Sequence, residues 1–434
     1  MTRRPSDRVV SLSVSVAALA AASGIQIERG RRAHEPESPG LTVEHGPAAM
    51  VDRKAPAVAR DGPAQHALRC SATGCSIAPG RGPCRKPIEP VLRWRFETGG
   101  PVTASPALSP DGGSVYVGSH DGYLYALDRH GKRRWSRFLG GKVYSGALVG
   151  KNGHVFVGSD ARALWSFSAT GELRWRFRTA GEADTTPAQA PDGTLYFAAG
   201  ASLYALGAQG RELWRLRVPA KIYSSPALGP DGTIYTGSQD DHLYAVDRAG
   251  RVRWRYRTRG DVDAAPLVGQ HGNVYVGSDD DRLYALSADG RLRWAANLGG
   301  HVRARPALDA HGGVIASSFG PRATILSLDA RLGRVRWHHR LPLAYSTEAG
   351  SRSGAVVGVR GSIYVGAHDH KLYAFDPHGR LRWTYRTAGR IDSTPTLGPD
   401  NALYFGTRGG AVYALTDSAL RCEQASANER PPSP

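Results

Sequence analysis

Hydrophobic and polar residues alternate in short runs that recur about every forty residues along most of this chain. One unit extends from Val115 to Trp135 and reads VYVGSHDGYLYALDRHGKRRW. VYVG, LYALD and KRRW each have the length and composition of a β-strand, and turn residues separate them. A fourth short strand, VTASPA at 102–107, precedes the unit. A fixed period of this length is typical of a repeat architecture in which each unit forms one small sheet.

One tryptophan marks the last strand of each unit, and consecutive tryptophans are 39 to 46 residues apart. We expect all eight to be structural: Trp94, Trp135, Trp175, Trp214, Trp254, Trp294, Trp337 and Trp383. The last unit reaches VYAL at Val412 without a tryptophan strand, whereas the first tryptophan strand, at 92–96, has no unit before it. The pattern therefore predicts an all-β, eight-bladed β-propeller of four-stranded antiparallel blades, closed by the N-terminal strand that completes the last blade.

The tryptophan strands also show how the outer edge of each blade is protected. In LRWRF the period of two places Leu92, Trp94 and Phe96 inward and places Arg93 and Arg95 outward. Charged residues on an exposed edge strand discourage pairing with other chains. The glycine that ends the VYVG-like strand is expected to allow a close approach of neighbouring backbone. These glycines are Gly118, Gly158, Gly237, Gly277, Gly366 and Gly406.

The chain is strongly basic, with 56 Lys and Arg against 38 Asp and Glu and a net charge of +18. Such a balance is found in proteins that bind nucleic acid, anionic lipid or acidic polysaccharide. Arginines on the predicted outer strands account for much of the excess, and no recognition helix or aromatic platform accompanies them. We therefore expect no nucleic-acid partner, and an acidic envelope polysaccharide remains an alternative ligand.

The N-terminus has the pattern of an export signal. Arg3, Arg4 and Arg8 precede an apolar run from Val9 to Ala22, and small residues follow. This run is too short to span a bilayer, and no cysteine follows it to accept a lipid. We predict a signal peptide at 1–23, a disordered Pro/Gly/Ala/Arg-rich linker at 24–88, the propeller at 89–420 and a disordered tail at 421–434. The protein is expected to be exported, periplasmic or extracellular, without a lipid anchor or a transmembrane segment, and monomeric.

The chain has four cysteines, Cys70, Cys75, Cys84 and Cys422. An even number in an oxidising compartment predicts disulfides, with three possible pairings. Closure of the ring would bring both ends of the repeat region together, which favours a disulfide between Cys422 and one of the three N-terminal cysteines. A metal site on these cysteines is not expected, because no histidine stands at ligand spacing from them.

The repeat resembles the PQQ-like (quinoprotein-type) β-propeller family. The matching stretch is YVGSHDGYLYALDRHGKRRW at 116–135, with near-copies YTGSQDDHLYAVDRAGRVRW at 235–254 and YVGSDDDRLYALSADGRLRW at 275–294. The resemblance covers about residues 91–416 and implies the propeller fold. Its members include PQQ-dependent dehydrogenases and non-catalytic scaffolds of the BamB type, and the chain is closer in style to the scaffolds.

The dehydrogenases that this chain resembles hold PQQ over a tryptophan and a calcium ion between Glu, Asn and Asp. Many also carry an adjacent Cys-Cys pair. This sequence has no Cys-Cys pair, and no Glu/Asn/Asp set in it matches the family's calcium ligands. We therefore predict that the protein is not an enzyme and has no cofactor. A PQQ-dependent dehydrogenase with PQQ and calcium is the alternative.

A comparison of the eight units with one another points to a candidate site. One position near the start of the innermost strand varies in charge: Thr103, Tyr144, Asp184, Tyr223, Asp263, Arg303, Arg352 and Asp392. In a closed ring these side chains would encircle one mouth of the central channel. They either bind a polar ligand, an ion or a loop of a partner, or line a solvated pore as surface ion pairs of little energetic value.

Two further features bear on the site. Two stretches are longer than their counterparts, SSFGPRATIL at 317–326 and LPLAYSTEAGSRSG at 341–354, and both are expected on the face that carries the ring. The acidic and histidine-rich turns at 279–281 and 368–370 suggest metal ligands, but turn chemistry is the simpler interpretation and no metal is expected. The sequence thus favours an exported, non-catalytic scaffold that binds a protein or peptide partner of the cell envelope at the channel mouth.

Overall fold

The computed structural model describes residues 43–45, 89–342, 350–358 and 360–417. The predicted signal peptide, the four cysteines and the predicted C-terminal tail lie outside the described residues. Of the predicted linker, the structure describes only Val43–His45, which form the strand β1. Within the described part of the chain, no helix combines the length and the apolar character that crossing a bilayer requires.

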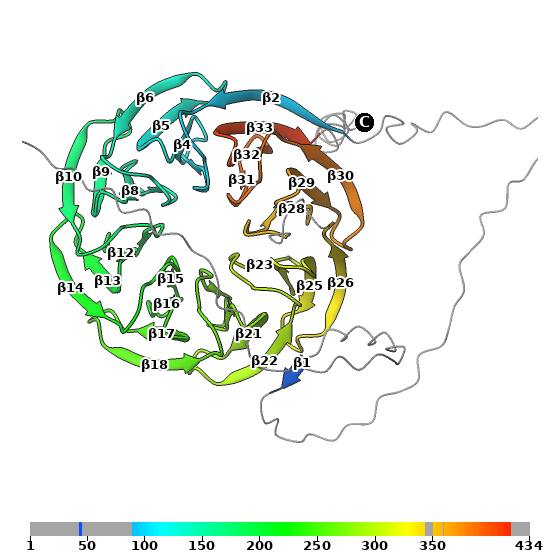
Figure 1. The fold of residues 1–434 in the computed structure, drawn as a ribbon. Coiled ribbons are helices and arrows are strands. Elements are labelled where there is room, and N and C mark those ends of the chain that lie inside the picture. Colours follow the sequence, from blue (N-terminus) through cyan, green and yellow to red (C-terminus); the bar gives the residue numbers. More distant parts are fainter. Residues whose placement is uncertain (1–42, 46–88, 343–349, 359, 418–434) are drawn as a thin grey trace, which may run out of the picture. The chain divides into compact units, whose positions relative to one another are not determined.

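The described residues between 89 and 417 form eight antiparallel four-stranded blades around a central axis, so the predicted fold is confirmed (Figure 1). We number the blades 1 to 8 in chain order. The innermost strands have two residues each: β3 (Ala107–Leu108), β7 (Leu148–Val149), β11 (Ala188–Gln189), β15 (Ala227–Leu228), β19 (Leu267–Val268), β23 (Ala307–Leu308), β27 (Val356–Val357) and β31 (Thr396–Leu397). The second strands are β4 (Ser114–Gly118), β8 (Val155–Ser159), β12 (Leu195–Ala199), β16 (Ile234–Ser238), β20 (Val274–Gly277), β24 (Gly313–Ser317), β28 (Ile363–Gly366) and β32 (Ala402–Gly406).

The third strands carry the LYAL-like pattern. They are β5 (Tyr123–Asp128), β9 (Ala163–Phe167), β13 (Ser202–Leu206), β17 (His242–Val246), β21 (Arg282–Leu286), β25 (Thr324–Asp329), β29 (Lys371–Phe375) and β33 (Ala411–Asp417). The outer strands of blades 1 to 7 are β6 (Arg133–Phe138), β10 (Leu173–Arg178), β14 (Glu212–Arg217), β18 (Val252–Arg257), β22 (Leu292–Asn297), β26 (Val335–Arg340) and β30 (Leu381–Arg386). Second and third strands are almost wholly buried, because both of their faces pack against neighbouring blades.

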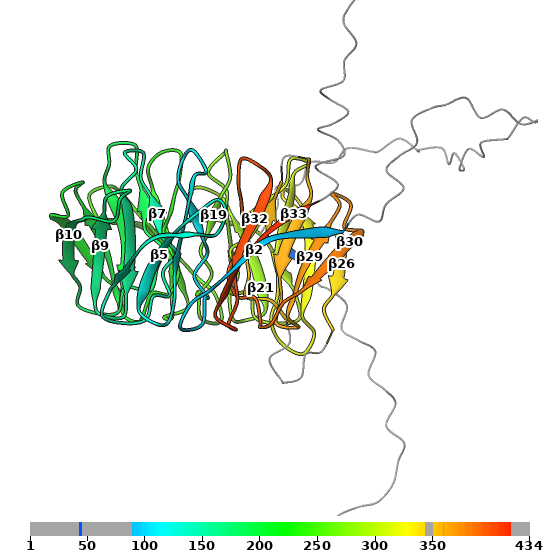
Figure 2. The ribbon, with the colours of Figure 1, turned by 90° about the horizontal axis from the view of Figure 1, so that it is seen from above.

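The outer strand of blade 8 comes from the beginning of the propeller sequence. Strand β2 (Pro90–Glu97) pairs antiparallel with β33, from Pro90 opposite Asp417 to Glu97 opposite Ala411. Figures 1 and 2 show the two strands side by side. Blade 8 therefore combines the two ends of the described propeller.

The expected inward position of Leu92 is wrong, because the side chain is 44% exposed. The pairing of β2 with β33 shifts register between Leu92 and Trp94, which places two residues of β2 opposite one residue of β33. Such a bulge shifts the alternation of side chains by one position. Trp94 and Phe96, beyond the bulge, pack on the core as expected. The other seven outer-strand pairings carry the same kind of shift.

The repeat tryptophan joins each blade to the next one. In blade 4 the indole Nε1 of Trp254 donates a 2.9 Å hydrogen bond to the carbonyl oxygen of Ala288, in a turn of blade 5. The ring covers Gly290 of the same turn, where an added Cβ would lie 2.6 Å from the indole. Gly290 also has a φ of +83°, so both space and backbone conformation require glycine. The indole hydrogen bond recurs for Trp94, Trp135, Trp175, Trp214 and Trp294.

Trp383 shows what happens where this turn is missing. Its indole Nε1 is buried and has no hydrogen-bond partner among the described residues. The Trp337 indole is also without such a partner, although it packs on Gly379 in the turn of blade 7, so a missing turn is not the only cause. Trp383 packs against blade 8, whose outer strand β2 is not continuous with β33. Blade 8 thus has no hairpin turn between its last two strands, and no turn carbonyl is available to Trp383.

The glycines that end the second strands allow the predicted close approach. A Cβ added at Gly277 of β20 would lie 2.1 Å from the carbonyl oxygen of Val302, which belongs to the innermost segment of blade 6. An added Cβ would also clash at Gly118, Gly158, Gly237, Gly366 and Gly406. Because Val302 directly precedes Arg303, this contact fixes the position of a predicted ring residue.

Replacement of Trp254 by alanine tests the link between blades. We expect Trp254→Ala to lower the free energy of unfolding by about 3–5 kcal/mol, because the indole loses its packing on Gly290 as well as its hydrogen bond. Val252→Ala on the same strand is the control, since Val252 is 43% exposed and should change stability by less than about 0.5 kcal/mol. Denaturant unfolding measures both. Equal, small effects would contradict the role assigned to the tryptophan.

Candidate functional site

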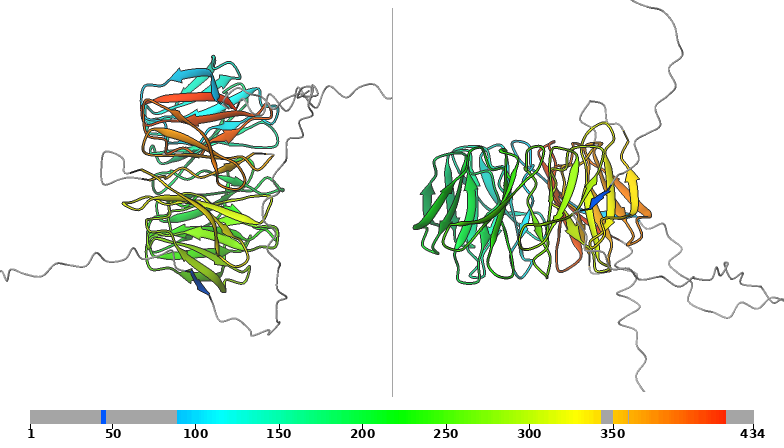
Figure 3. Two further views of the ribbon diagram at one scale, coloured as in Figure 1. Left: turned by 90° about the vertical axis from the view of Figure 1, so that its right-hand side faces the viewer. Right: turned by 90° about the horizontal axis from the view of Figure 1, so that it is seen from below.

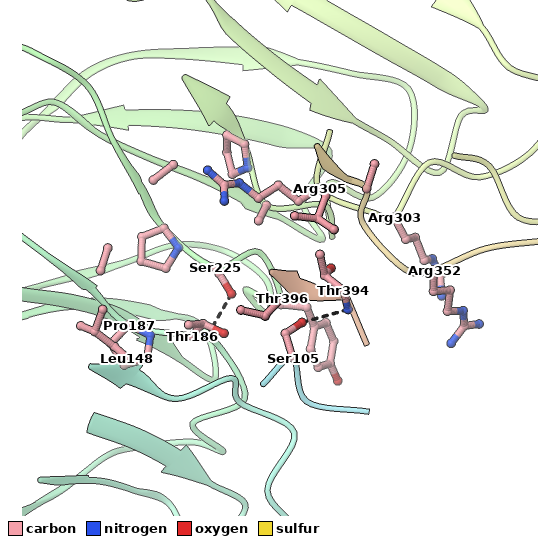
Figure 4. Close-up of a pocket in the computed structure, with 18 of the residues that line it drawn as sticks. Ser105, Leu148, Thr186, Pro187, Ser225, Arg303, Arg305, Arg352, Thr394 and Thr396 are labelled. Carbon is pink, nitrogen blue, oxygen red and sulfur yellow. Dashed lines mark hydrogen bonds between the residues drawn. The ribbon is translucent and has the colours of Figure 1, made fainter. Parts of the chain in front are cut away.

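A cavity of about 930 Å³ lies at the centre of the propeller, and all eight blades contribute to its wall (Figure 4). Six of the eight predicted ring residues line it: Thr103, Tyr223, Asp263, Arg303, Arg352 and Asp392. Tyr144 and Asp184 are not among the lining residues. The repeat thus brings together, from all eight blades, side chains that the sequence spaces about forty residues apart.

The backbone of each ring residue is held by the blade before it. The amide of Val302 donates to the carbonyl of Ser278 at 3.1 Å, and the amide of Val262 donates to the carbonyl of Ser238 at 3.2 Å. Arg303 and Asp263 follow these two valines. Their side chains therefore start from fixed points on the channel wall.

Arg303 is paired with acidic residues of blade 5. Its Nε lies 2.9 Å and its Nη2 2.5 Å from the carboxylate of Asp279, and its Nε lies 3.9 Å from Asp263. Carboxylate oxygens of Asp261, Asp263 and Asp279 lie within 4.8 Å of one another. The guanidinium of Arg303 supplies one positive charge, which offsets part of the negative charge of this acidic group.

Burial and crowding change the protonation of this group. Burial, followed by the negative charge of Asp279, raises the pKa of Asp263 to about 6 against the opposing effect of Arg303. The hydrogen bond with Asp279 raises the pKa of Arg303, which therefore stays charged. One oxygen of Asp263, Oδ1, is buried and has no hydrogen-bond partner among the described residues.

Asp392 of blade 8 has the opposite environment. Its side chain is 7% exposed, and its carboxylate contacts Nε2 of His368 at 2.7 Å and also Nε of Arg408. Burial acts to raise the pKa of Asp392, but the hydrogen bond and charge of His368, together with Arg408, outweigh it and lower the pKa to about 2. The Asp392 carboxylate is thus an ionised member of a buried network.

Phe319, from the longer stretch at 317–326, covers the arginines of the ring. The Arg352 guanidinium lies 4.4 Å from the centre of its ring, and that of Arg303 lies 5.8 Å away. The backbone of Phe319 bridges His301 on one side and Gly350 on the other. This stretch therefore lies on the face that carries the ring. Residues 343–349 of the other long stretch lie outside the described residues.

The remaining ring residues contact the turns of adjoining strands. Thr103 Oγ1 lies 2.8 Å from His120 Nε2, and the His120 and Tyr144 rings are 4.2 Å apart. Lys221 donates to Tyr223 at 3.2 Å and to Glu182 at 2.9 Å. Burial and the neighbouring Asp160 carboxylate raise the pKa of Asp184 above its ordinary value.

The sequence comparison missed Arg305, which belongs to a second ring two residues further along each innermost segment. The residues of this ring are Ser105, Gly146, Thr186, Ser225, Ala265, Arg305, Gly354 and Thr394. Neighbours in it are tied together, because the amide of Thr186 donates to Ser225 Oγ at 2.9 Å and that of Thr394 to Ser105 Oγ at 3.0 Å. Alignment of the eight units at this position would have found Arg305, the one charged residue among small ones.

Arg305 lines the cavity without a side-chain hydrogen bond or ion pair to any described residue. Its surface is accessible to solvent in the channel, yet the surrounding protein lowers its pKa by desolvation. Figure 4 shows Arg303 and Arg352 side by side, with Arg305 extending in a different direction. Arg305 is therefore the charged group of the cavity wall that the described residues leave without a counter-charge.

The two suggested metal turns serve the fold. Tyr373 donates to Asp369 at 2.6 Å, and Tyr284 donates to Asp280, so each middle aspartate anchors a tyrosine of its own third strand. Asp281 and His370 occupy the left-handed position that Gly122 takes in blade 1, with φ of +68°, +67° and +88°. Asp279 and His368 pair with ring residues, as described above. Turn and ion-pair chemistry thus accounts for both stretches.

Comparison with known families identifies the repeat. Residues 91–202, 199–376 and 321–422 match the model of the family described as outer membrane protein assembly factor BamB. The chain belongs to this BamB family. The resemblance to PQQ-like propeller repeats is therefore confirmed.

Two solved structures with the same fold are similar to this BamB-family chain. The crystal structure of BamB from Moraxella catarrhalis is 18% identical, has a TM-score of 0.63 and is covered completely by 76% of this chain. The computationally designed Ika8 protein is 13% identical, has a TM-score of 0.60 and is covered to 99% by 75% of this chain. At these identities the likeness concerns the fold.

One curated protein, the beta-alanine-activating enzyme of Danio rerio, is 41% identical over 66 residues. The match takes in 14% of this chain and spans 6% of the length of that enzyme. The similarity is therefore limited to a single stretch of repeat and concerns only this small part of the enzyme.

The wall of the cavity in this BamB-family chain contains no tryptophan among the described residues, because the repeat tryptophans lie on the outer strands and Trp165 lies on β9. The cavity thus lacks an indole on which a planar quinone could stack. Arg303 already occupies the acidic group of blade 5 where a calcium ion would need free carboxylates.

The opposite pKa shifts of Asp263 and Asp392 predict opposite pH effects. Because the pKa of Asp263 is raised from 3.8 to about 6, its protonated form contributes to the free energy of unfolding. This contribution is full below pH 3.8 and is lost as the pH rises through 6. Relative to wild type, Asp263→Asn should therefore gain about 1–3 kcal/mol in unfolding free energy between pH 4 and 7. Denaturant unfolding at several pH values measures this change.

Asp392→Asn is the matched control for that experiment. Because the pKa of Asp392 is lowered, its ionised form contributes to the free energy of unfolding. This contribution is present above pH 3.8 and is lost as the pH falls through about 2. The variant should be destabilised at neutral pH, and the deficit should shrink in acid. The same pH trend in both variants would refute the environments described above.

Proposed function

We propose that this protein is an exported, non-catalytic scaffold that binds a segment of a protein partner at one mouth of its central channel. The observation that carries the proposal is the cavity of about 930 Å³, to which all eight blades contribute and in which seven of them place a polar or charged side chain. Binding sites are typically concave and largely preformed, with a few polar groups that fix the orientation of the ligand. This cavity has these properties.

Two charged groups of the cavity wall, Arg303 and Asp392, are already held in place by neighbouring side chains. Asp279 clamps Arg303, and both His368 and Arg408 contact Asp392. Side chains fixed in this way lose little conformational entropy when a partner binds. They suit recognition of an inserted segment better than proton transfer, which requires a group that changes its protonation state during a reaction.

Arg305 defines the chemistry expected of the partner segment. A guanidinium without a counter-charge, in a partly desolvated channel, favours a carboxylate that binds through two parallel hydrogen bonds. Hydroxyl groups of Thr186, Ser225 and Thr394 lie in the same ring and offer further hydrogen bonds. We therefore propose that the segment carries an acidic side chain or a terminal carboxylate.

The cellular setting of the proposal rests on two independent supports. The charged, apolar and small residues of the first 23 positions follow the order of an export signal. The description of the family names outer membrane protein assembly, which is a process of the cell envelope. We propose that the partner is a protein of that envelope.

The acidic polysaccharide alternative receives no support from the outer strands. Several of their arginines already have acidic partners, such as Arg253 with Asp231 at 2.6 Å and Arg382 with Asp417 at 3.2 Å. The quinoprotein alternative lacks a tryptophan in the cavity wall. Stoichiometric binding of PQQ with calcium, together with dye-linked alcohol oxidation, would nevertheless replace the scaffold by a quinoprotein.

Site-specific photo-crosslinking tests the proposed binding face. A photoreactive residue at Tyr223, at the cavity in blade 4, is compared with one at Leu213, on the outer strand β14 of the neighbouring blade 3; the two side chains are 40% and 56% exposed. In cells that produce the protein, we expect a discrete protein adduct from position 223 and none from position 213. Arg305→Gln should lower the yield about tenfold, because a charged hydrogen bond is worth about 1.5–3 kcal/mol. No adduct from position 223, or equal adducts from both positions, would contradict the proposal.

A further inference from the structure

The outer strand of blade 5 differs from those of the other blades. The three residues that follow the repeat tryptophan include at least one arginine in β2, β6, β10, β14, β18, β26 and β30. In β22 these three residues are Ala295, Ala296 and Asn297. After its tryptophan, β22 thus lacks the arginines that protect the other outer edges there, although Arg293 precedes Trp294.

The same strand is covered in the structure. Trp294 is 0% and Ala295 is 1% exposed, whereas Trp254 of β18 is half-buried and Arg255 is exposed. Strand β1 pairs with β22 in antiparallel register, with Val43, Glu44 and His45 opposite Ala296, Ala295 and Trp294. Figure 1 and Figure 3 show β1 on the outer side of β22. Blade 5 is therefore a five-stranded sheet, whereas the other seven blades have four strands each among the described residues.

These two observations have one physical explanation. An outer strand presents a row of unpaired amide and carbonyl groups, and an extended segment can pair with that row. Arginines hinder such pairing because an incoming strand would have to displace or desolvate them. Alanine side chains let a second backbone approach without this penalty. The outer strand that has no arginine after its tryptophan is the one that carries an additional strand there.

We propose that the outer edge of β22 is a strand-acceptor site for the chain's own segment around Val43–His45, and that this segment binds in cis and covers the edge. The proposal is independent of the function proposed for the cavity. It assigns to the N-terminal part of the chain a fixed attachment point on blade 5. It also implies that β22, once uncovered, would accept another extended segment.

The length of the connection permits binding in cis. The 44 residues from 46 to 89 lie between His45 and β2. Fully extended, a chain of this length reaches about 145 Å. A domain the size of this propeller has a radius of gyration of about 20 Å. The segment can therefore reach blade 5 from β2 on blade 8 without help from a second copy.

Hydrogen–deuterium exchange of the full-length protein tests the site. We expect amides of Val43–His45 to exchange at least tenfold more slowly than in an unstructured peptide. Ala295→Arg gives β22 the pattern of its neighbours and should abolish this protection. Thr384→Arg, at the same position of β30 and exposed, is the matched control and should leave it unchanged.

A second variant keeps the test valid if Ala295→Arg destabilises the propeller. Val43→Pro/Glu44→Pro removes two consecutive donors, at least one of which faces β22 in an antiparallel pair. This variant should speed exchange in Ala295–Asn297 at least tenfold without changing the melting temperature. A synthetic peptide of residues 40–48 should restore the protection.

Three results would overturn the proposal. The first is wild-type exchange at 43–45 as fast as in an unstructured peptide. The second is unchanged exchange of β22 in the proline variant. The third is protection that falls on dilution together with a dimer in sedimentation, which would show that a second copy supplies the strand.

Discussion

The packing of a tryptophan of one blade against the turn glycine of the next is the contact on which the other features of this propeller depend. Trp254 and Gly290 show its two requirements, an indole that reaches a turn carbonyl and a turn with a left-handed residue that has no side chain. Repetition of this contact fixes the rotation between blades. Where the turn is missing, at blade 8, the indole of Trp383 remains without its hydrogen bond, and strand pairing between β2 and β33 takes over the connection.

The candidate site inherits its geometry from this packing. When blades approach closely, Gly277 meets Val302, and Arg303 is thereby placed at the channel. The same contact at other blades places the remaining ring residues, whatever their charge. The framework can thus hold acidic residues beside Arg303, an ionised Asp392 and an uncompensated Arg305 without a change of fold. This separation of framework and lining explains how a repeat with nearly uniform strands presents a non-uniform binding surface.

Much of the fold could be predicted from the sequence, because tryptophan spacing, strand alternation and turn glycines are local signals that recur from blade to blade. The exposure of Leu92 could not be predicted, because a bulge is a property of strand pairing and leaves no mark on the alternation of apolar and polar residues. The position of six ring residues at the cavity followed from symmetry. The pairing of Asp392 with His368 did not follow from symmetry, because it joins segments of two different blades. The attachment of β1 to β22 likewise depends on segments far apart in the chain.

Strand β2 belongs to blade 8 and completes the ring, and hydrogen–deuterium exchange of an Arg95→Pro variant tests this arrangement most directly. Arg95 lies opposite Tyr413 in the β2–β33 pair, and proline there disrupts that pairing. We expect a larger loss of protection in β33 of blade 8 than in β5 of blade 1. Unchanged protection in β33, or an equal loss in both strands, would contradict it.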